Sequence, residues 1–307
     1  MTYVGSPHLP ESAPWHGLLI LDKPPGITSR AALDRAAAWF PLDTRVGHAG
    51  TLDPLASGVL VLCLGKATRL VEFVQDLPKT YRARLLLGAR SDTDDADGVC
   101  VPAPDARVPD LSEIRKALHG FVGEIQQVPP KYSAARHQGK RAYKLARKQH
   151  EFELAPRLVK IQQIAIETYA YPQLDLVIDC GKGTYIRSLA RDLGECLGCG
   201  GLIAALRRTR IGEFNEANAL KLESDIAQAR EQLLPISTAV AHLPRLDLSE
   251  ALVSRLCQGQ RLAQTDIPDV QHSGSCDLAV FDGAGQLAVI VRFEQELARI
   301  SPVKVMR

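Results

Sequence analysis

One stretch of the chain, residues 46–65, joins a polar loop directly to a continuous apolar run. The loop carries Gly47, Gly50 and the pair Asp53 and Pro54, which are typical of a tight turn. The run VLVLCL (59–64) does not alternate in polarity, which predicts a strand buried on both faces. Asp53 is therefore expected at the mouth of a core strand, where a packed backbone displays a side chain rigidly. A catalytic carboxylate and a turn aspartate that bonds its own backbone both fit this position.

Length and composition place the chain among globular proteins. Its 307 residues, 46% hydrophobic and 23% charged, suffice for one large core and a smaller second domain. The formal net charge of +2 is too small to indicate an anionic partner, so an argument for nucleic acid must rest on how charge is distributed. No stretch approaches the roughly 20 apolar residues of a membrane-spanning helix, and the first residues lack a signal-peptide pattern. We therefore expect a cytoplasmic protein with no membrane partner.

The seven cysteines do not form a disulfide or metal pattern. Their number is odd and they are scattered, which favours reduced thiols. Cys196 and Cys199 form a CxxC pair, but no second pair stands at zinc-finger spacing. We expect no metal and no cofactor.

The first part of the chain predicts an extension, a strand and a helix. Residues 1–16 contain three prolines and little apolar periodicity, which is typical of a loose extension. Residues 17–22 have the pattern of a buried strand that ends in a turn at 23–26. Thr28 or Ser29 can then cap an alanine-rich helix that runs to about Phe40, and a short helix is expected at 65–73.

Residues 80–87 alternate in polarity, which predicts a strand with one face turned to the core. Tyr81 falls on the apolar face near the start of this strand. Its ring could stack on a nucleic-acid base, or it could be a core tyrosine whose hydroxyl finds a partner.

An acidic run follows at 92–98. Its spacing does not fit a calcium loop, and no Glu stands at the twelfth position from Asp92. We interpret the run as a solvated turn.

Seven Lys or Arg residues and no Asp or Glu lie between positions 131 and 148. Cations on one segment can neutralise phosphates, whereas solvated faces usually mix charges of both signs. The aromatic rings among them could position a bent RNA backbone. We therefore favour RNA contact over a solvated face, with a helix carrying the cations at 140, 141, 144 and 147.

Two strand patterns, 157–167 and 174–180, precede a glycine-rich turn and a helix that runs to about residue 197. Tyr185 and Arg187 fall in the first turn of this helix. The helix dipole disfavours a cation there. A nearby carboxylate such as Asp53 could compensate the positive charge of Arg187 at this position. Alternatively, the Arg187 side chain could bend away from the helix into water.

The pattern changes at about residue 243. Asp282, Gly283 and Gly285 separate two apolar runs, which indicates a hairpin. The short strands of this stretch predict a compact β domain, either an RNA-binding module or an inert appendage.

Several segments together resemble one family. GHAGTLDPLASGVL (47–60) is similar to the catalytic segment of the TruB-type tRNA pseudouridine synthases. The similarity covers most of residues 17–215, and the stretch from 243 resembles a PUA-type RNA-binding domain. The other matching segments are GLLILDKPPGITS (17–29), KTYRARLLLG (79–88), PPKYSA (129–134), HQGKRAY (137–143), GKGTYIRSLARDLGE (181–195) and LRRT (206–209).

The resemblance implies a fold and a set of domains. The fold is α+β, with a mixed, largely antiparallel central sheet flanked by helices and a small C-terminal β-rich PUA-like domain. The domains are a flexible extension (1–16), a catalytic domain (17–242) with an RNA-gripping basic insert at about 125–155, and the PUA-like domain (243–307).

The resemblance also implies roles for individual residues. Asp53 is the nucleophile that allows uracil to leave ribose at N1, turn and rejoin through C5, and Arg187 pairs with Asp53 and keeps it ionised. Tyr81 stacks on the uracil and takes a proton, and His48 fills the stack that the flipped base has left. The expected substrate-binding residues are His48, Lys23, Tyr185, Leu206, Lys131, Arg136, Lys140, Arg141, Lys144 and Arg147.

The expected function is isomerisation of the T-loop uridine (position 55) of tRNA to pseudouridine, with assistance to tRNA folding as a second role. The chain is expected to bind the T-arm as a monomer without an obligatory protein partner. Two alternatives stay open. An RNA-binding protein without catalysis is disfavoured by the intact Asp53, Tyr81 and Arg187, and a hydrolase that uses Asp53 and His48 as nucleophile and base is disfavoured by the basic segment. A box H/ACA-type ribonucleoprotein subunit is disfavoured because the basic insert suits direct tRNA binding.

Overall fold

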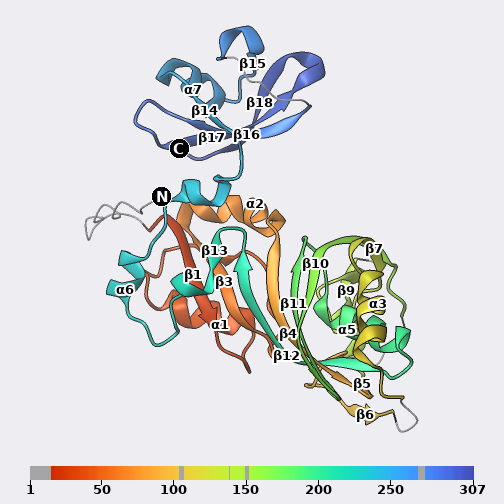
Figure 1. The fold of residues 1–307 in the computed structure, drawn as a ribbon. Helices are drawn as coiled ribbons and strands as arrows, with labels where there is room; N and C mark the ends of the chain where they lie inside the picture. The colour runs from red at the N-terminus through yellow and green to blue at the C-terminus, as the bar shows by residue number, and fades with distance from the viewer. Residues whose placement is uncertain (1–14, 104–106, 138, 149–151, 269–273) are drawn as a thin grey trace.

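A nine-stranded sheet forms the centre of the computed structural model, which describes residues 15–103, 107–137, 139–148, 152–268 and 274–307 (Figure 1). The strand order is β1-β3-β12-β4-β11-β10-β7, with β2 paired to β3 and β13 to β12. Every pair is antiparallel except β3 with β12, so the predicted mixed, largely antiparallel α+β sheet is confirmed. The strands are β1 (Gly17–Lys23), β2 (Val46–His48), β3 (Ser57–Leu64), β4 (Lys79–Leu87), β7 (Gly123–Gln127), β10 (Arg157–Ala170), β11 (Gln173–Cys180), β12 (Gly201–Ile211) and β13 (Phe214–Asn215).

Short helices flank this sheet. Thr28 caps the first of them by accepting a hydrogen bond from the backbone N–H of Ala31 (3.0 Å), and the helix ends at Ala37, earlier than the predicted Phe40. Among the described residues, no helix is long and apolar enough to cross a membrane. The α-helices are α1 (Ser29–Ala37), α2 (Val71–Asp76), α3 (Leu111–His119), α4 (Ala142–Ala146), α5 (Ile186–Cys196), α6 (Ile226–Glu231) and α7 (Glu250–Cys257), and the 3-10 helices are η1 (Gly65–Leu70), η2 (Glu216–Asn218), η3 (Ile236–Val240), η4 (Gln264–Asp266) and η5 (Gln295–Leu297).

Strands β1 and β3 are buried on both faces, as the apolar runs predicted. Alternate side chains of β3 enter two different hydrophobic clusters: Val59 and Val61 belong to one, and Leu60 and Leu62 to the other. The strand pair therefore fixes the backbone on which the preceding loop, with Asp53, is mounted.

Strand β4 confirms the predicted period of two. Its inward side chains, beginning with Tyr81, join the cluster beneath α3 and α5. Two outward side chains form ion pairs with other strands: Arg84 with Asp175 of the adjacent β11 (2.8 Å), and Arg82 with Glu167 of β10, one strand further (3.3 Å). In this half of the sheet, helices cover one face, and the other face is exposed and carries ion pairs between strands.

The C-terminal β domain is a five-stranded sheet of order β14-β16-β17-β18-β15. The predicted hairpin joins β16 to β17. Phe281, Ile290 and Met306 share a hydrophobic cluster with Leu70 and Val74 of η1 and α2, so the C-terminal sheet packs on this part of the chain through apolar side chains. The C-terminal sheet lies on the α2 side of the larger sheet (Figure 1). The strands are β14 (Arg245–Asp247), β15 (Leu262–Ala263), β16 (Cys276–Phe281), β17 (Leu287–Glu294) and β18 (Arg299–Val305).

The basic segment is not the helix that its charge spacing suggested. Strand β8 (Arg136–His137) pairs with β9 (Lys140–Arg141), and only the five residues of α4 follow as a helix. A strand pair intervenes because the glycine at 139 adopts a positive φ of 79° and turns the chain. The remaining short pair is β5 (Ala89–Ser91) with β6 (Cys100–Pro102).

The predicted N-terminal extension lies mostly outside the described residues. Trp15, near the end of this extension, is buried with the centre of its ring 4.9 Å from that of Phe40. The guanidinium carbon of Arg230 lies over the Trp15 ring, 4.6 Å from its centre. The packed structure therefore begins two residues before the predicted start at Gly17.

Candidate active site

Asp53 lies in the loop between β2 and β3, and buried polar groups fix that loop. The hydroxyl of Ser29 donates to the carbonyl of Leu52 (2.9 Å) and accepts from its N–H (2.7 Å). The ammonium of Lys23 donates to the carbonyl of Pro54 (3.3 Å), which also accepts from the N–H of Gly26 (2.8 Å). These bonds satisfy the backbone on both sides of Asp53 and so hold its side chain in one place.

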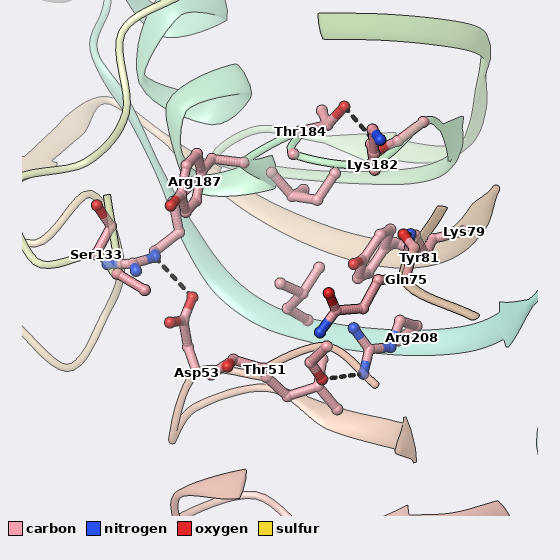
Figure 2. Close-up of a pocket in the computed structure, with 18 of the residues that line it drawn as sticks. Thr51, Asp53, Gln75, Lys79, Tyr81, Ser133, Lys182, Thr184, Arg187 and Arg208 are labelled. Carbon is pink, nitrogen blue, oxygen red and sulfur yellow. Dashed lines mark hydrogen bonds and ion pairs between the residues drawn. The ribbon is translucent and has the colours of Figure 1, made fainter. Parts of the chain in front are cut away.

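Arg187 meets Asp53 from the first turn of α5 (Figure 2). Its Nε lies 2.9 Å from Oδ2 of Asp53, in the geometry of an ion pair rather than of an aligned hydrogen bond. The side chain of Arg187 is 5% exposed, whereas that of Asp53 keeps 35% exposure toward the cavity. The carboxylate is therefore oriented by a buried cation and remains open to a substrate.

The acidic run at 92–98 is a turn, and its residues Asp92 and Asp97 are exposed. Our interpretation of the whole run as solvated is wrong for Asp95, which holds Arg187. Asp95 is only 4% exposed, and its Oδ2 lies 3.2 Å from Nη1 of Arg187. The same guanidinium donates to the carbonyls of Thr93 (2.8 Å) and Tyr132 (2.9 Å). Acidic residues are rarely buried unless they are paired, and here the partner comes from a helix far along the chain.

Burial raises the pKa of Asp53 above its ordinary value. Arg187 lowers this pKa, but Asp95 raises it again, and burial is the largest effect. Arg187 lowers the pKa of Asp53 as expected, but burial outweighs it, so the net shift is upward. A carboxylate with a raised pKa is a stronger nucleophile when ionised, because it is less well solvated.

A cavity of about 680 Å³ opens above Asp53. Three residues expected in the pocket, Tyr81, Tyr185 and Leu206, line it (Figure 2 labels Tyr81). The side-chain amide of the buried Gln127 fixes Tyr185 by accepting from its N–H (2.8 Å) and donating to its carbonyl (3.0 Å). The guanidinium carbon of Arg157 lies 4.3 Å from the centre of the Tyr185 ring.

His48 and Lys23 lie outside the residues that line this cavity. His48 is half-buried on β2, and burial, Arg208 and Arg30 lower its pKa, so its ring is neutral at neutral pH. Its buried Nδ1 has no partner among the described residues, and no hydrogen bond joins it to Asp53. Lys23 is fully buried, its ammonium donates to three backbone carbonyls, and burial lowers its pKa to about 8. It supports the pocket and is not placed to contact RNA.

The described cations of the basic segment are exposed beside the cavity. Ser133 and Ala134, at the base of the segment, line the cavity wall opposite β12. Arg147 lies over the ring of Tyr143 at 5.6 Å. The exposed cations are Lys131, Arg136, Lys140, Lys144, Arg147 and Lys148, and the fold places Arg141 in β9.

Several residues of the site were not expected from the sequence. Ser29 was interpreted only as a helix cap, and no local pattern indicated the burial of Gln127 and Arg208. The run of acidic residues next to a strand was the one available clue to Asp95.

Two family models match the chain and together cover about two thirds of it. The first, described as TruB family pseudouridylate synthase (N terminal domain), matches residues 40–186. The second, described as tRNA pseudouridylate synthase B C-terminal domain, matches residues 187–241.

Curated relatives and solved structures agree with the family models. "tRNA pseudouridine synthase B" of Xanthomonas campestris pv. campestris (strain B100) is 41% identical over 300 residues, which cover 95% of this chain and 94% of the relative. The protein of the same name from Aromatoleum aromaticum is 45% identical over 251 residues, covering 80% and 81%. A Cbf5-Nop10-Gar1 complex contains a chain that matches with a TM-score of 0.75 and 26% identity over 95% of this chain and 85% of that one. An H/ACA RNP bound to a substrate RNA containing 2′-deoxyuridine matches with a TM-score of 0.73, 25% identity and the same coverage. The chain belongs to the TruB family of pseudouridine synthases.

Proposed function

We propose that this chain isomerises the T-loop uridine at position 55 of tRNA to pseudouridine, with Asp53 as the nucleophile. The observation that carries the proposal is the Asp53 carboxylate on the floor of an open cavity, 2.9 Å from a buried arginine. The curated relatives named tRNA pseudouridine synthase B support tRNA as the substrate.

The reaction needs a carboxylate, an apolar pocket that encloses the uracil during the rearrangement, and a proton acceptor. The bond from uracil N1 to ribose C1′ breaks and its electron pair goes to the uracil ring, while the carboxylate of Asp53 stabilises the intermediate by a covalent bond. The uracil then turns, and C5 bonds to C1′ while the covalent bond to Asp53 breaks and frees the carboxylate. The hydrogen on C5 leaves as a proton, and N1 takes up a proton from solvent. The ring of Tyr81 would stack on the uracil and its oxygen would take that proton.

The target base must leave the T-loop to reach Asp53, at a cost of a few kcal/mol. His48 would fill the vacated position, and its neutral ring suits stacking on the neighbouring bases. The exposed cations of the basic segment would bind phosphates of the T-arm beside the cavity.

The remaining expectations stay part of the proposal. The chain acts as a cytoplasmic monomer on the T-arm without an obligatory protein partner, and residues 243–307 act as a PUA-like RNA-binding domain beside a catalytic domain at 17–242. Assistance to tRNA folding is a second role. The hydrolase alternative is disfavoured because no hydrogen bond joins His48 to Asp53, so the two do not act as base and nucleophile.

Incubation of the protein with a tRNA transcript that lacks modifications tests this proposal. We expect pseudouridine at position 55, mapped by mass spectrometry, and none in a transcript that carries cytidine there. Binding without pseudouridine would favour the RNA-binding alternative, and pseudouridine only at other positions would overturn the T-loop assignment.

A further inference from the structure

Arg208 is a buried cation in the wall of the active-site cavity. It is 2% exposed and lies on β12 in the middle of the sheet. Its guanidinium donates to two carbonyls, those of Val59 (2.8 Å) and Gly50 (3.0 Å). In the described parts of the chain it forms no ion pair, whereas Arg207 beside it pairs with Asp22 (2.9 Å). A buried charge costs several kcal/mol unless something compensates it, and the two carbonyls leave this cation without an anionic partner.

Tyr81 is the residue directly opposite Arg208 on the neighbouring strand. The two are paired across β4 and β12, and directly opposed residues of antiparallel strands project their side chains from the same face. Both line the cavity, on the side away from Arg187 (Figure 2). The cation is thus placed to act on the Tyr81 oxygen.

Three charged or titratable groups act electrostatically on the Tyr81 hydroxyl: Arg208 on β12, Cys180 on β11 and Asp53 in the loop before β3. Burial raises the pKa of Tyr81, Arg208 lowers it, and the other two raise it. Burial also raises the pKa of Cys180 to about 11, so its thiol is neutral near pH 7. Arg208 is the one cation among these three groups, and it is the one that lowers the pKa of Tyr81.

We propose that Arg208 is a positioning residue that stabilises the phenolate form of Tyr81 while Tyr81 takes the proton from C5 of the uracil. In this step the C5–H bond breaks, its electron pair re-forms the C5–C6 double bond of uracil, the electron pair of the N1–C6 double bond returns to N1, and the C5 proton bonds to the phenolate oxygen. N1 takes up a proton from solvent, and the phenol returns its proton to solvent before the next cycle. The inference rests on the role proposed above for Tyr81.

A double-mutant cycle separates this role from a structural one, because Arg208 also ties β3 to the catalytic loop. We expect Arg208→Met to lower the single-turnover rate at saturating tRNA by about 100-fold, the scale of acid–base catalysis. In a Tyr81→Phe background the same change should lower the rate by less than about threefold, because coupled residues are not additive. Arg208→Lys, which keeps the charge, should recover much of the rate. Arg207→Met is the matched control on the same strand, and its effect should be equal in both backgrounds.

Each outcome bears on a different claim. An equal loss from Arg208→Met in both backgrounds, or no loss in either, would overturn the proposal and leave Arg208 as a structural tie. A wild-type rate for Tyr81→Phe alone would overturn the role of Tyr81 as well.

A second measurement does not depend on the folding of Arg208→Met. Replacing Tyr81 by 3-fluorotyrosine makes the phenol more acidic, so the rise of the single-turnover rate with pH should move to lower pH. Arg208→Lys, a weaker partner for the phenolate, should move that rise to higher pH. Coincident pH profiles for all three proteins would contradict the proposal.

Discussion

The Nε atom of Arg187 lies 2.9 Å from Oδ2 of Asp53, and the other nitrogens of the same guanidinium are all engaged by the acidic turn and the base of the basic segment. The position of Asp53 is therefore set by groups from three distant parts of the chain. Changes in any of them should alter the chemical step more than the binding of RNA, because none of these contacts lies on the exposed surface.

Replacing Asp95 by Asn should change both the rate and its dependence on pH. Asp95 raises the pKa of Asp53, so its neutralisation should lower that pKa. Because Asp53 must be ionised to act, the fall in single-turnover rate on acidification should move to lower pH in Asp95→Asn. Its rate on the plateau should fall about ten- to 100-fold, since a misplaced catalytic group costs up to about 100-fold. Movement of the acidic limb to higher pH would contradict the assigned charges.

Two substitutions separate the proposed roles of Tyr81. Tyr81→Phe keeps the ring and should preserve tRNA affinity, but it removes the oxygen that takes the proton, so the single-turnover rate should fall by about 100-fold or more. Tyr81→Leu removes stacking as well and should also raise the half-saturating protein concentration. Near-wild-type rates for both variants would place Tyr81 outside the reaction.

Gln127 should prove important for stability and for the cavity wall. Gln127→Leu leaves the N–H and carbonyl of Tyr185 without their partner, and an unsatisfied buried group costs about 1–3 kcal/mol. We expect the free energy of unfolding, measured by urea denaturation, to fall by about that amount. Gln126, the exposed neighbour, provides the control: Gln126→Leu should change the free energy of unfolding by less than about 0.5 kcal/mol. Equal stabilities of the two variants would show that the amide does not hold Tyr185.

The basic segment should bind phosphates without taking part in the chemistry. Replacing Lys140, Arg141, Lys144 and Arg147 together by Ala should weaken tRNA binding and flatten the plot of log affinity against log salt, by roughly 0.7 to 0.9 for each lost contact. The single-turnover rate at saturating tRNA should stay within about threefold of wild type.

Exposed cations elsewhere provide the comparison for this experiment. Arg115 and Lys116 lie on α3 and are exposed, and their replacement by Ala should leave the salt slope unchanged. If the quadruple variant and this control have the same slope and affinity as wild type, the segment is a solvated face.

The sequence predicted what local pattern encodes. The unbroken apolar run of β3 reflects burial on both of its faces, and the alternation of β4 reflects burial on one face. The segments that resemble the family located Asp53, Tyr81 and Arg187. These three residues lie in elements whose period or turn chemistry is readable over a few positions.

Contacts between distant segments could not be read in this way. Asp95 looked solvated because acidic runs usually are, and its burial depends on an arginine on α5. The spacing of the basic segment suggested a helix, whereas a glycine turn produces a strand pair. The raised pKa of Asp53 likewise depends on how deeply the loop is packed, which no local pattern reports.

The central claim, that the Asp53 carboxylate is the nucleophile, is tested most directly by the single-turnover conversion of unmodified tRNA with Asp53→Asn. Asn has nearly the same shape but cannot act as a carboxylate nucleophile, so we expect no pseudouridine at position 55 while tRNA affinity stays within about threefold of wild type. Intact-protein and peptide mass spectrometry must exclude deamidation of Asn back to Asp. Formation of pseudouridine by verified Asp53→Asn at a measurable rate would contradict the account.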